Sequence, residues 1–173
     1  AMSATEAAPS GAGIIAALEA AKVEFVVALP DIVTSEHVLK PLAHHPGIRL
    51  VRVCKEDEGI SICAALSYCQ RRAVLLIQHT GLLDSLNALR AIAVEYRLPI
   101  CLMVGLQGRE EGVQPRRSAS YGVRIVEPIL EAMAVRHTLL EAAADVARIE
   151  PTIAAAYQAS EPVVMLVGRS PGP

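Results

Sequence analysis

Short, continuous apolar runs alternate along this chain with segments in which apolar residues recur at helical spacing. Runs that are rich in Val, Ile and Leu and apolar on both faces are typical of strands buried in a parallel sheet. The predicted strands are 23–29, 48–53, 73–78, 99–105 and 162–168, with 134–139 as a candidate sixth strand. The predicted helices are 11–21, 35–43, 58–70, 83–96, 124–134 and 143–158.

This alternation predicts an open, doubly wound α/β domain, with a mainly parallel six-stranded sheet and helices on both faces. We expect one domain at 11–168, between an N-terminal tail at 1–10 and a C-terminal tail at 169–173. Ala1 before Met2 is typical of a cloning scar. Ligands of such a fold usually bind outside the carboxyl ends of the strands, so the functional loops should follow the strands.

Composition and charge narrow the classes of function. Of 173 residues, 53% are hydrophobic, which is enough apolar sequence for one buried core. The net charge of -2 is scattered along the chain, which argues against nucleic acid or an anionic membrane as a partner. Apolar runs are shorter than the roughly 20 residues that cross a bilayer, and no signal pattern opens the sequence, so we expect a cytoplasmic protein. The cysteines lack CxxC spacing, which favours buried, reduced thiols over disulfides or zinc.

Polar residues gather in three segments that each follow a predicted strand: "ALPDIVTSEH", "CKEDEG" and "IQHTGLLDS". Each segment has a purely structural interpretation. Asp31 or Thr34 can cap the next helix, and acids at a helix start are favoured by the helix dipole. The occurrence of three such loops in one chain nevertheless favours a functional site.

Several motifs carry a resemblance to a known family. The stretches "EGISICAALSY", "IQHTGLLDSLNAL" and "PICLMVGLQGR" occur in order and at compatible spacing. Together they resemble the pyrimidine-binding (PYR) domain of thiamine-diphosphate-dependent decarboxylases, nearest to the sulfopyruvate and phosphonopyruvate decarboxylase branch. "LPDI" and "GVQPRRSASYGVRIVEPILEAM" are similar to further parts of that branch, so the resemblance covers roughly 11–168. It implies a PYR-type fold, with thiamine diphosphate and Mg²⁺ as cofactors.

The resemblance distinguishes between the three acids of "KEDEG". Glu58, directly before Gly59, matches the family's catalytic glutamate. In the family, that carboxyl group hydrogen-bonds N1′ of the cofactor's aminopyrimidine and favours the tautomer that removes the thiazolium proton. Glu56 and Asp57 do not match, and we interpret them as solvated acids at a helix start.

Further site residues are implied in the same way. The implied cofactor contacts besides Glu58 are Pro30, Asp31, Thr80 and Gly81. Gln78 is expected to bind the substrate carboxylate. His79 stands where the family usually has Asn, and two roles stay open for it, proton donor in catalysis or polar lining residue. In the long polar loop 106–122, Arg116 and Arg117 are the expected counter-charges for a substrate anion, against the alternative of an exposed turn. Arg109 and Arg124, in or beside the same loop, are further candidates for this role.

The sequence lacks one part of the family's site. It contains no Gly-Asp-Gly, and Asn87 is its only Asn, whereas the family holds Mg²⁺ and the diphosphate with that motif and a downstream Asn. The resemblance therefore implies a beta subunit that carries the pyrophosphate-binding domain, in a hetero-oligomer such as α2β2 or larger. The expected reaction is 3-sulfopyruvate to sulfoacetaldehyde and CO2, with Glu58 acting across the subunit interface. The alternatives are phosphonopyruvate or another anionic 2-keto acid as substrate, or a non-catalytic binding or regulatory module.

Overall fold

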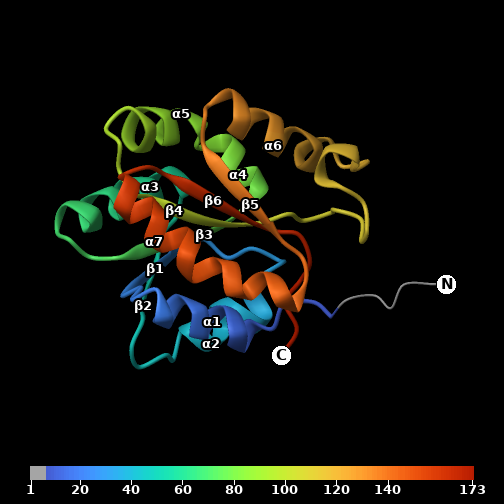
Figure 1. The fold of residues 1–173 in the computed structure, drawn as a ribbon, viewed down its shortest axis with the longest axis horizontal. Coiled ribbons are helices and arrows are strands. Elements are labelled where there is room, and N and C mark those ends of the chain that lie inside the picture. Colours follow the sequence, from blue (N-terminus) through green and yellow to red (C-terminus); the bar gives the residue numbers. More distant parts are fainter. Residues whose placement is uncertain (1–6) are drawn as a thin grey trace.

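A six-stranded parallel sheet forms the centre of the computed structural model, which describes residues 7–173 (Figure 1). The strand order is β2-β1-β3-β4-β6-β5, and all neighbouring strands are parallel. The strands are β1 Phe25–Ala28, β2 Arg49–Arg52, β3 Ala73–Gln78, β4 Cys101–Gly105, β5 Arg136–Leu140 and β6 Val163–Val167. The predicted fold class is confirmed, including the sixth strand. The expected cloning scar at Ala1 lies outside the described residues.

Helices cover both faces of the sheet (Figure 1). The α-helices are α1 Gly11–Ala20, α2 Lys40–Leu42, α3 Glu56–Tyr68, α4 His79–Asp84, α5 Leu86–Ala88, α6 Tyr121–Ala132 and α7 Ile149–Ala159. The remaining helical segments are the π-helical η1 Ser35–Leu39 and η2 Leu89–Val94 and the 3₁₀-helical η3 Pro115–Arg117 and η4 Ala143–Arg148.

Each face of the sheet has its own apolar core. Side chains of α1, η1, α2 and α7 pack on one face, and side chains of α3, α4, η2 and α6 pack on the other. Along β3, Val74 and Leu76 belong to the first core, while Leu75 and Ile77 belong to the second. Successive side chains of a strand point to opposite faces, so a strand covered on both sides must be apolar at every position.

The connections place the predicted site segments at one edge of the sheet. From β1 the chain moves outward to β2 and then returns to β3 on the other side of β1. This reversal makes the carboxyl ends of β1 and β3 the topological switch point, where open α/β sheets usually bind ligands. The segments that begin at Pro30, Lys55 and His79 all start at this edge.

Two predicted boundaries near the site are wrong. The helix expected at 58–70 begins at Glu56, so Glu58 lies inside its first turn. The loop expected after the third strand is instead the first turn of α4, because Gln78 ends β3 in an extended conformation and directly serves as the N-cap. The helix expected at 83–96 is therefore a series of shorter pieces, α4, α5 and η2, that starts at His79.

The terminal segments pair with each other. The amide of Gly11 donates to the carbonyl of Gly172 at 2.8 Å, and the amide of Gly172 donates to the carbonyl of Pro9 at 2.9 Å. These two bonds form a short parallel bridge between Ser10 and Gly172. The described ends of the predicted tails are therefore fixed to one another.

The cysteines are free thiols in the structure, but only some of them are buried. Cys63 and Cys101 lie in the core, and burial raises the pKa of the Cys101 thiol to about 12. Cys54 and Cys69 are exposed, which corrects the prediction. The reason is local, because Cys54 follows the end of β2 and Cys69 is the C-cap of α3.

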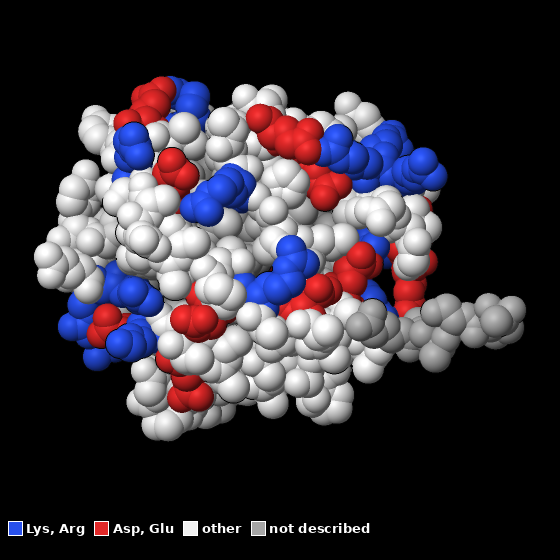
Figure 2. Space-filling view, in the orientation of Figure 1, with Lys and Arg blue, Asp and Glu red and all other residues white. Residues whose placement is uncertain are grey.

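The surface carries charges of both signs. Acidic and basic side chains are interspersed on the face shown in Figure 2, with broad uncharged areas between them. This distribution agrees with the net charge of -2 that the sequence gives. Within residues 7–173, every helix is too short or too polar to cross a membrane.

Candidate active site

The acidic turn after β2 forms the first turn of α3, and Glu58 caps that helix. Its Oε2 accepts hydrogen bonds from the backbone N–H groups of Cys54, at 3.1 Å, and Lys55, at 3.3 Å. Such N–H groups at a helix start have no partner within the helix, so a side-chain acceptor stabilises the turn. Glu58 is exposed, and its Oε1 has no hydrogen-bond partner in the part of the chain that the structure describes.

Glu56 joins the start of α3 to the start of α4. Its side chain is half-buried, and its carboxylate lies so close to Gly81 that a β-carbon there would overlap it. Asp57 stays local, since its Oδ1 accepts from the backbone N–H of Glu58 at 3.0 Å. The expectation of a solvated acid is therefore wrong for Glu56, because α4 begins directly at the end of β3 and brings Gly81 beneath the acidic turn.

The segment after β1 is organised by the buried carboxylate of Asp31, which is 2% exposed. Oδ1 accepts from the backbone N–H of Val33 at 2.7 Å, and Oδ2 accepts from both the backbone N–H and the hydroxyl of Thr34. This is the capping role that the sequence left open. Pro30, just before it, is exposed, so of these two implied cofactor contacts Pro30 is the one accessible at the surface. Their roles towards a cofactor stay predictions.

His79 is enclosed between three elements. It is 4% exposed, and its Nε2 lies where a β-carbon on Gly122, in the first turn of α6, would come within 2.9 Å. Burial lowers the pKa of His79, and the backbone of Gly105 and the charge of Asp31 act in the opposite direction. Its Nδ1 is buried without a hydrogen-bond partner among the described residues. Burial therefore favours the neutral form of this imidazole.

The remaining implied contacts sit at the β3–α4 junction. Thr80 is exposed in the first turn of α4, and Gly81 is buried beneath Glu56. Gln78 is half-buried, and its Nε2 donates to Oε1 of Gln107, which follows β4. Sequence reasoning missed Gln107. The available signals were its position two residues after the end of a buried strand and its place inside the matching stretch "PICLMVGLQGR".

The candidate arginines differ in how far they are already paired. The side chain of Arg109 is buried, donates to the carbonyl of Gly168 at 2.9 Å and forms an ion pair with Glu141. Arg124 donates to the carbonyl of Ser118 at 2.9 Å. Arg116 forms ion pairs with the α6 carboxylates Glu127 and Glu131.

Arg117 is exposed at the end of η3. Its side chain makes no hydrogen bond or ion pair within residues 7–173. Of the two predicted substrate arginines, Arg117 is therefore the one whose charge is uncommitted in this chain. The role itself stays a prediction.

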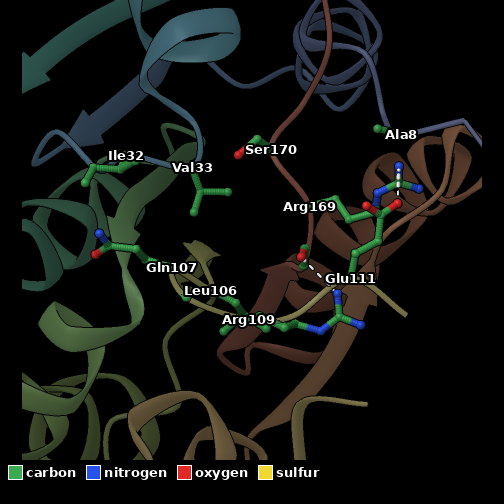
Figure 3. Close-up of a pocket in the computed structure, with 11 residues that line it drawn as sticks. Ala8, Ile32, Val33, Leu106, Gln107, Arg109, Glu111, Arg169 and Ser170 are labelled. Atoms are coloured by element: carbon green, nitrogen blue, oxygen red, sulfur yellow. Dashed lines mark hydrogen bonds and ion pairs between the residues drawn. The ribbon is translucent and has the colours of Figure 1, made fainter. Parts of the chain in front are cut away.

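A cleft of about 390 Å³ opens at the carboxyl ends of β1, β4 and β6 (Figure 3). It is lined in part by Ile32, Val33, Gln107, Arg109 and Arg169. Arg169 pairs with Glu111 at 2.8 Å. Among residues 7–173, no group of three or more His, Cys, Asp or Glu side chains is arranged to hold a metal ion.

Comparison with known proteins identifies relatives. The chain is 30% identical over 101 residues to the sulfopyruvate decarboxylase subunit alpha of Methanothermobacter thermautotrophicus. These 101 residues are 58% of this chain and 61% of that protein. This chain is 31% identical over 86 residues to the subunit alpha of Methanococcus maripaludis, covering 50% and 51% of the two chains. The chain is a relative of sulfopyruvate decarboxylase alpha subunits. The predicted resemblance to that branch is therefore confirmed.

A third relative matches this chain over a smaller share of its own length. Sulfopyruvate decarboxylase of Methanosarcina acetivorans is 27% identical over 118 residues, which are 68% of this chain but 30% of that protein. The chain thus matches between 30% and 61% of the length of these relatives. No protein-family model matches the chain.

Proposed function

We propose that this chain is the alpha subunit of a two-chain, thiamine-diphosphate-dependent decarboxylase that converts 3-sulfopyruvate to sulfoacetaldehyde and CO2. The observation that carries the proposal is the presentation of Glu58. The one acid that matches the family's motif is exposed at the carboxyl edge of the sheet, with Oε1 uncommitted. The names of the relatives support the substrate.

The chemistry of Glu58 fits the proposed cofactor. Bound thiamine diphosphate supplies the electron sink that lets a 2-keto acid lose CO2. Glu58 would place a proton between its Oε1 and the aminopyrimidine nitrogen N1′. The two backbone bonds to Oε2, from Cys54 and Lys55, hold the carboxylate in place before any ligand arrives, which lowers the entropic cost of alignment.

The neighbouring residues would bind and shield the reacting groups. Thr80 and Pro30 are exposed at the same edge of the sheet and can contact the cofactor. Gln78 would donate to the substrate carboxylate with its carboxamide. Burial and the lowered pKa of His79 support a role as a neutral lining group rather than as a proton donor.

A partner would complete the site. The relatives from Methanothermobacter and Methanococcus are named subunit alpha, which supports a second subunit. The Methanosarcina relative carries the name without a subunit designation, and the matched region is 30% of its length. We infer that a beta subunit holds Mg²⁺ and the diphosphate, and that Glu58 reaches the cofactor across the interface of a hetero-oligomer.

The test is turnover by the assembled complex. The chain is co-expressed with a candidate beta chain that carries Gly-Asp-Gly and a downstream Asn, and is given thiamine diphosphate and Mg²⁺. CO2 release is then measured from 3-sulfopyruvate, phosphonopyruvate and pyruvate. The proposal expects the highest kcat/KM on 3-sulfopyruvate. Higher kcat/KM on phosphonopyruvate would reject the substrate, and a loaded complex inactive on all three acids would reject the enzyme in favour of a binding module.

A further inference from the structure

A pair of carboxamides connects the β3–α4 junction to the cleft. Nε2 of Gln78 donates to Oε1 of Gln107, although 29 residues separate them along the chain. The register of the sheet explains the contact. Gln78, the last residue of β3, pairs with Gly105, the last residue of β4, and Gln107 follows two residues later. The two side chains therefore meet at the carboxyl edge of the sheet.

The cleft has two chemically different ends. Figure 3 shows Gln107 near Ile32 at one end, with its carboxamide pointing away from Arg109, while Arg169 and Glu111 lie at the other end. At the second end, the positive charges of the arginines are already paired with carboxylates of this chain. Arg109 pairs with Glu141, and Arg169 pairs with Glu111. An incoming anion there would meet the carboxylate of Glu111, whereas the lining residues around Gln107 bring no acid.

The hydrogen-bond inventory leaves donors at the carboxamide end. Because Gln107 accepts with its Oε1, both hydrogens of its Nε2 remain available. Gln78 uses one hydrogen of its own Nε2 and keeps the other. Within residues 7–173, the Nε2 of Gln107 donates to no acceptor. A neutral amide that donates to an ionised acceptor makes a stronger hydrogen bond than one between two neutral groups.

We propose that Gln107 binds the anionic group at the far end of the substrate, and so sets a preference for a 2-keto acid with a second, terminal anion over a 2-keto acid whose far end is uncharged. The inference rests on the proposed function. The 2-keto carboxylate would lie on Gln78 and the sulfonate on Gln107, so the pair receives the two ends of a three-carbon dianion. The contact between the two side chains also holds the Gln78 carboxamide in one orientation. Nothing in the motif match assigns this residue.

The experiment compares a dianionic and a monoanionic substrate in the assembled complex. Gln107→Ala and Gln107→Glu are assayed on 3-sulfopyruvate and on pyruvate. Gln114→Ala is the matched control, since Gln114 is exposed in the same loop and does not line the cleft. Calorimetric titration with 3-sulfopropionate, which carries the same terminal anion but no keto group, measures binding without turnover.

In Gln107→Ala we expect KM for 3-sulfopyruvate to rise about tenfold, with kcat within about twofold, because one hydrogen bond to an anion is lost. KM for pyruvate should stay within about twofold. Gln107→Glu places a carboxylate against the sulfonate and should raise KM for 3-sulfopyruvate further, by about a hundredfold. The affinity for 3-sulfopropionate should fall by matching factors, and Gln114→Ala should change none of these values.

Two results would overturn the inference. Equal losses on both substrates in Gln107→Ala would show a merely structural role, and unchanged KM and unchanged 3-sulfopropionate affinity would show no role. A wild-type complex that binds 3-sulfopropionate but does not turn over 3-sulfopyruvate would reject the proposed function alone. In that case a tenfold loss of 3-sulfopropionate binding in Gln107→Ala would still support the subsite, and unchanged binding would reject it.

Discussion

The carboxylate of Asp31 lies against the α-carbon of Gly105, so that a β-carbon at position 105 would stand 2.5 Å from Oδ1 and 2.8 Å from Oδ2. Asp31 follows β1, and Gly105 is the last residue of β4. The carboxylate is fixed by its hydrogen bonds to Val33 and Thr34 and has little freedom to move aside. The backbone of Gly105 also contacts His79, where it opposes the lowering of the imidazole pKa by burial. Close packing at Gly105 therefore helps to set the distance between two of the predicted site segments.

Gly105→Ala should lower the free energy of unfolding by about 1–3 kcal/mol, because the added methyl group overpacks a site that cannot yield. Denaturant unfolding of the purified chain measures this change. Gly172→Ala is the control, since a β-carbon there meets nothing within 4 Å. Equal stability of the two variants would show that Asp31 moves freely, against this account.

His79 should make stability depend on pH. Burial lowers its pKa from the ordinary value of 6.5. As pH falls below that value, the unfolded chain takes up a proton that the folded chain resists, so stability is lost. The wild type should therefore lose more stability between about pH 7.5 and about pH 5.5 than His79→Asn does. A wild-type slope in His79→Asn would contradict the prediction.

The fold was predictable because its signal is local and repeated. Strands covered on both faces must be apolar throughout, as β3 shows with Val74 and Leu75 in opposite cores. The site was predictable only in part. The family motif singled out Glu58, but the start of α4 at His79 was missed, because a helix that follows a strand without a loop has no turn residues to announce it. The Gln78–Gln107 contact depends on strand register, which local sequence does not reveal.

Arg109 should act in stability rather than in substrate binding. Its side chain is 1% exposed and pairs with Glu141, which is 28% exposed. Arg109→Met should lower the free energy of unfolding by about 2–4 kcal/mol, because it leaves a partly buried carboxylate without its partner. Arg117→Met should change stability by no more than about 0.5 kcal/mol, since the side chain is exposed and unpaired within residues 7–173. Thermal and denaturant unfolding of both variants measures the difference in stability. Equal losses of stability in the two variants would contradict the structural role of Arg109.

Glu58 has two roles in this account, and two substitutions separate them. Glu58→Gln keeps an oxygen that can accept from the backbone N–H groups of Cys54 and Lys55, so the cap and the stability should survive within about 0.5 kcal/mol. Glu58→Ala removes the cap as well and should cost about 0.5–2 kcal/mol. Denaturant unfolding of the two variants checks this difference.

The most direct test of the central claim is the rate of CO2 release from 3-sulfopyruvate by the Glu58→Gln complex, compared with wild type at equal assembly and equal loading with thiamine diphosphate. The account predicts a rate about 10²–10⁴-fold lower, because a carboxamide cannot exchange the proton with the aminopyrimidine nitrogen. A rate within about twofold of wild type would contradict the assignment of Glu58 as the acid that activates the cofactor.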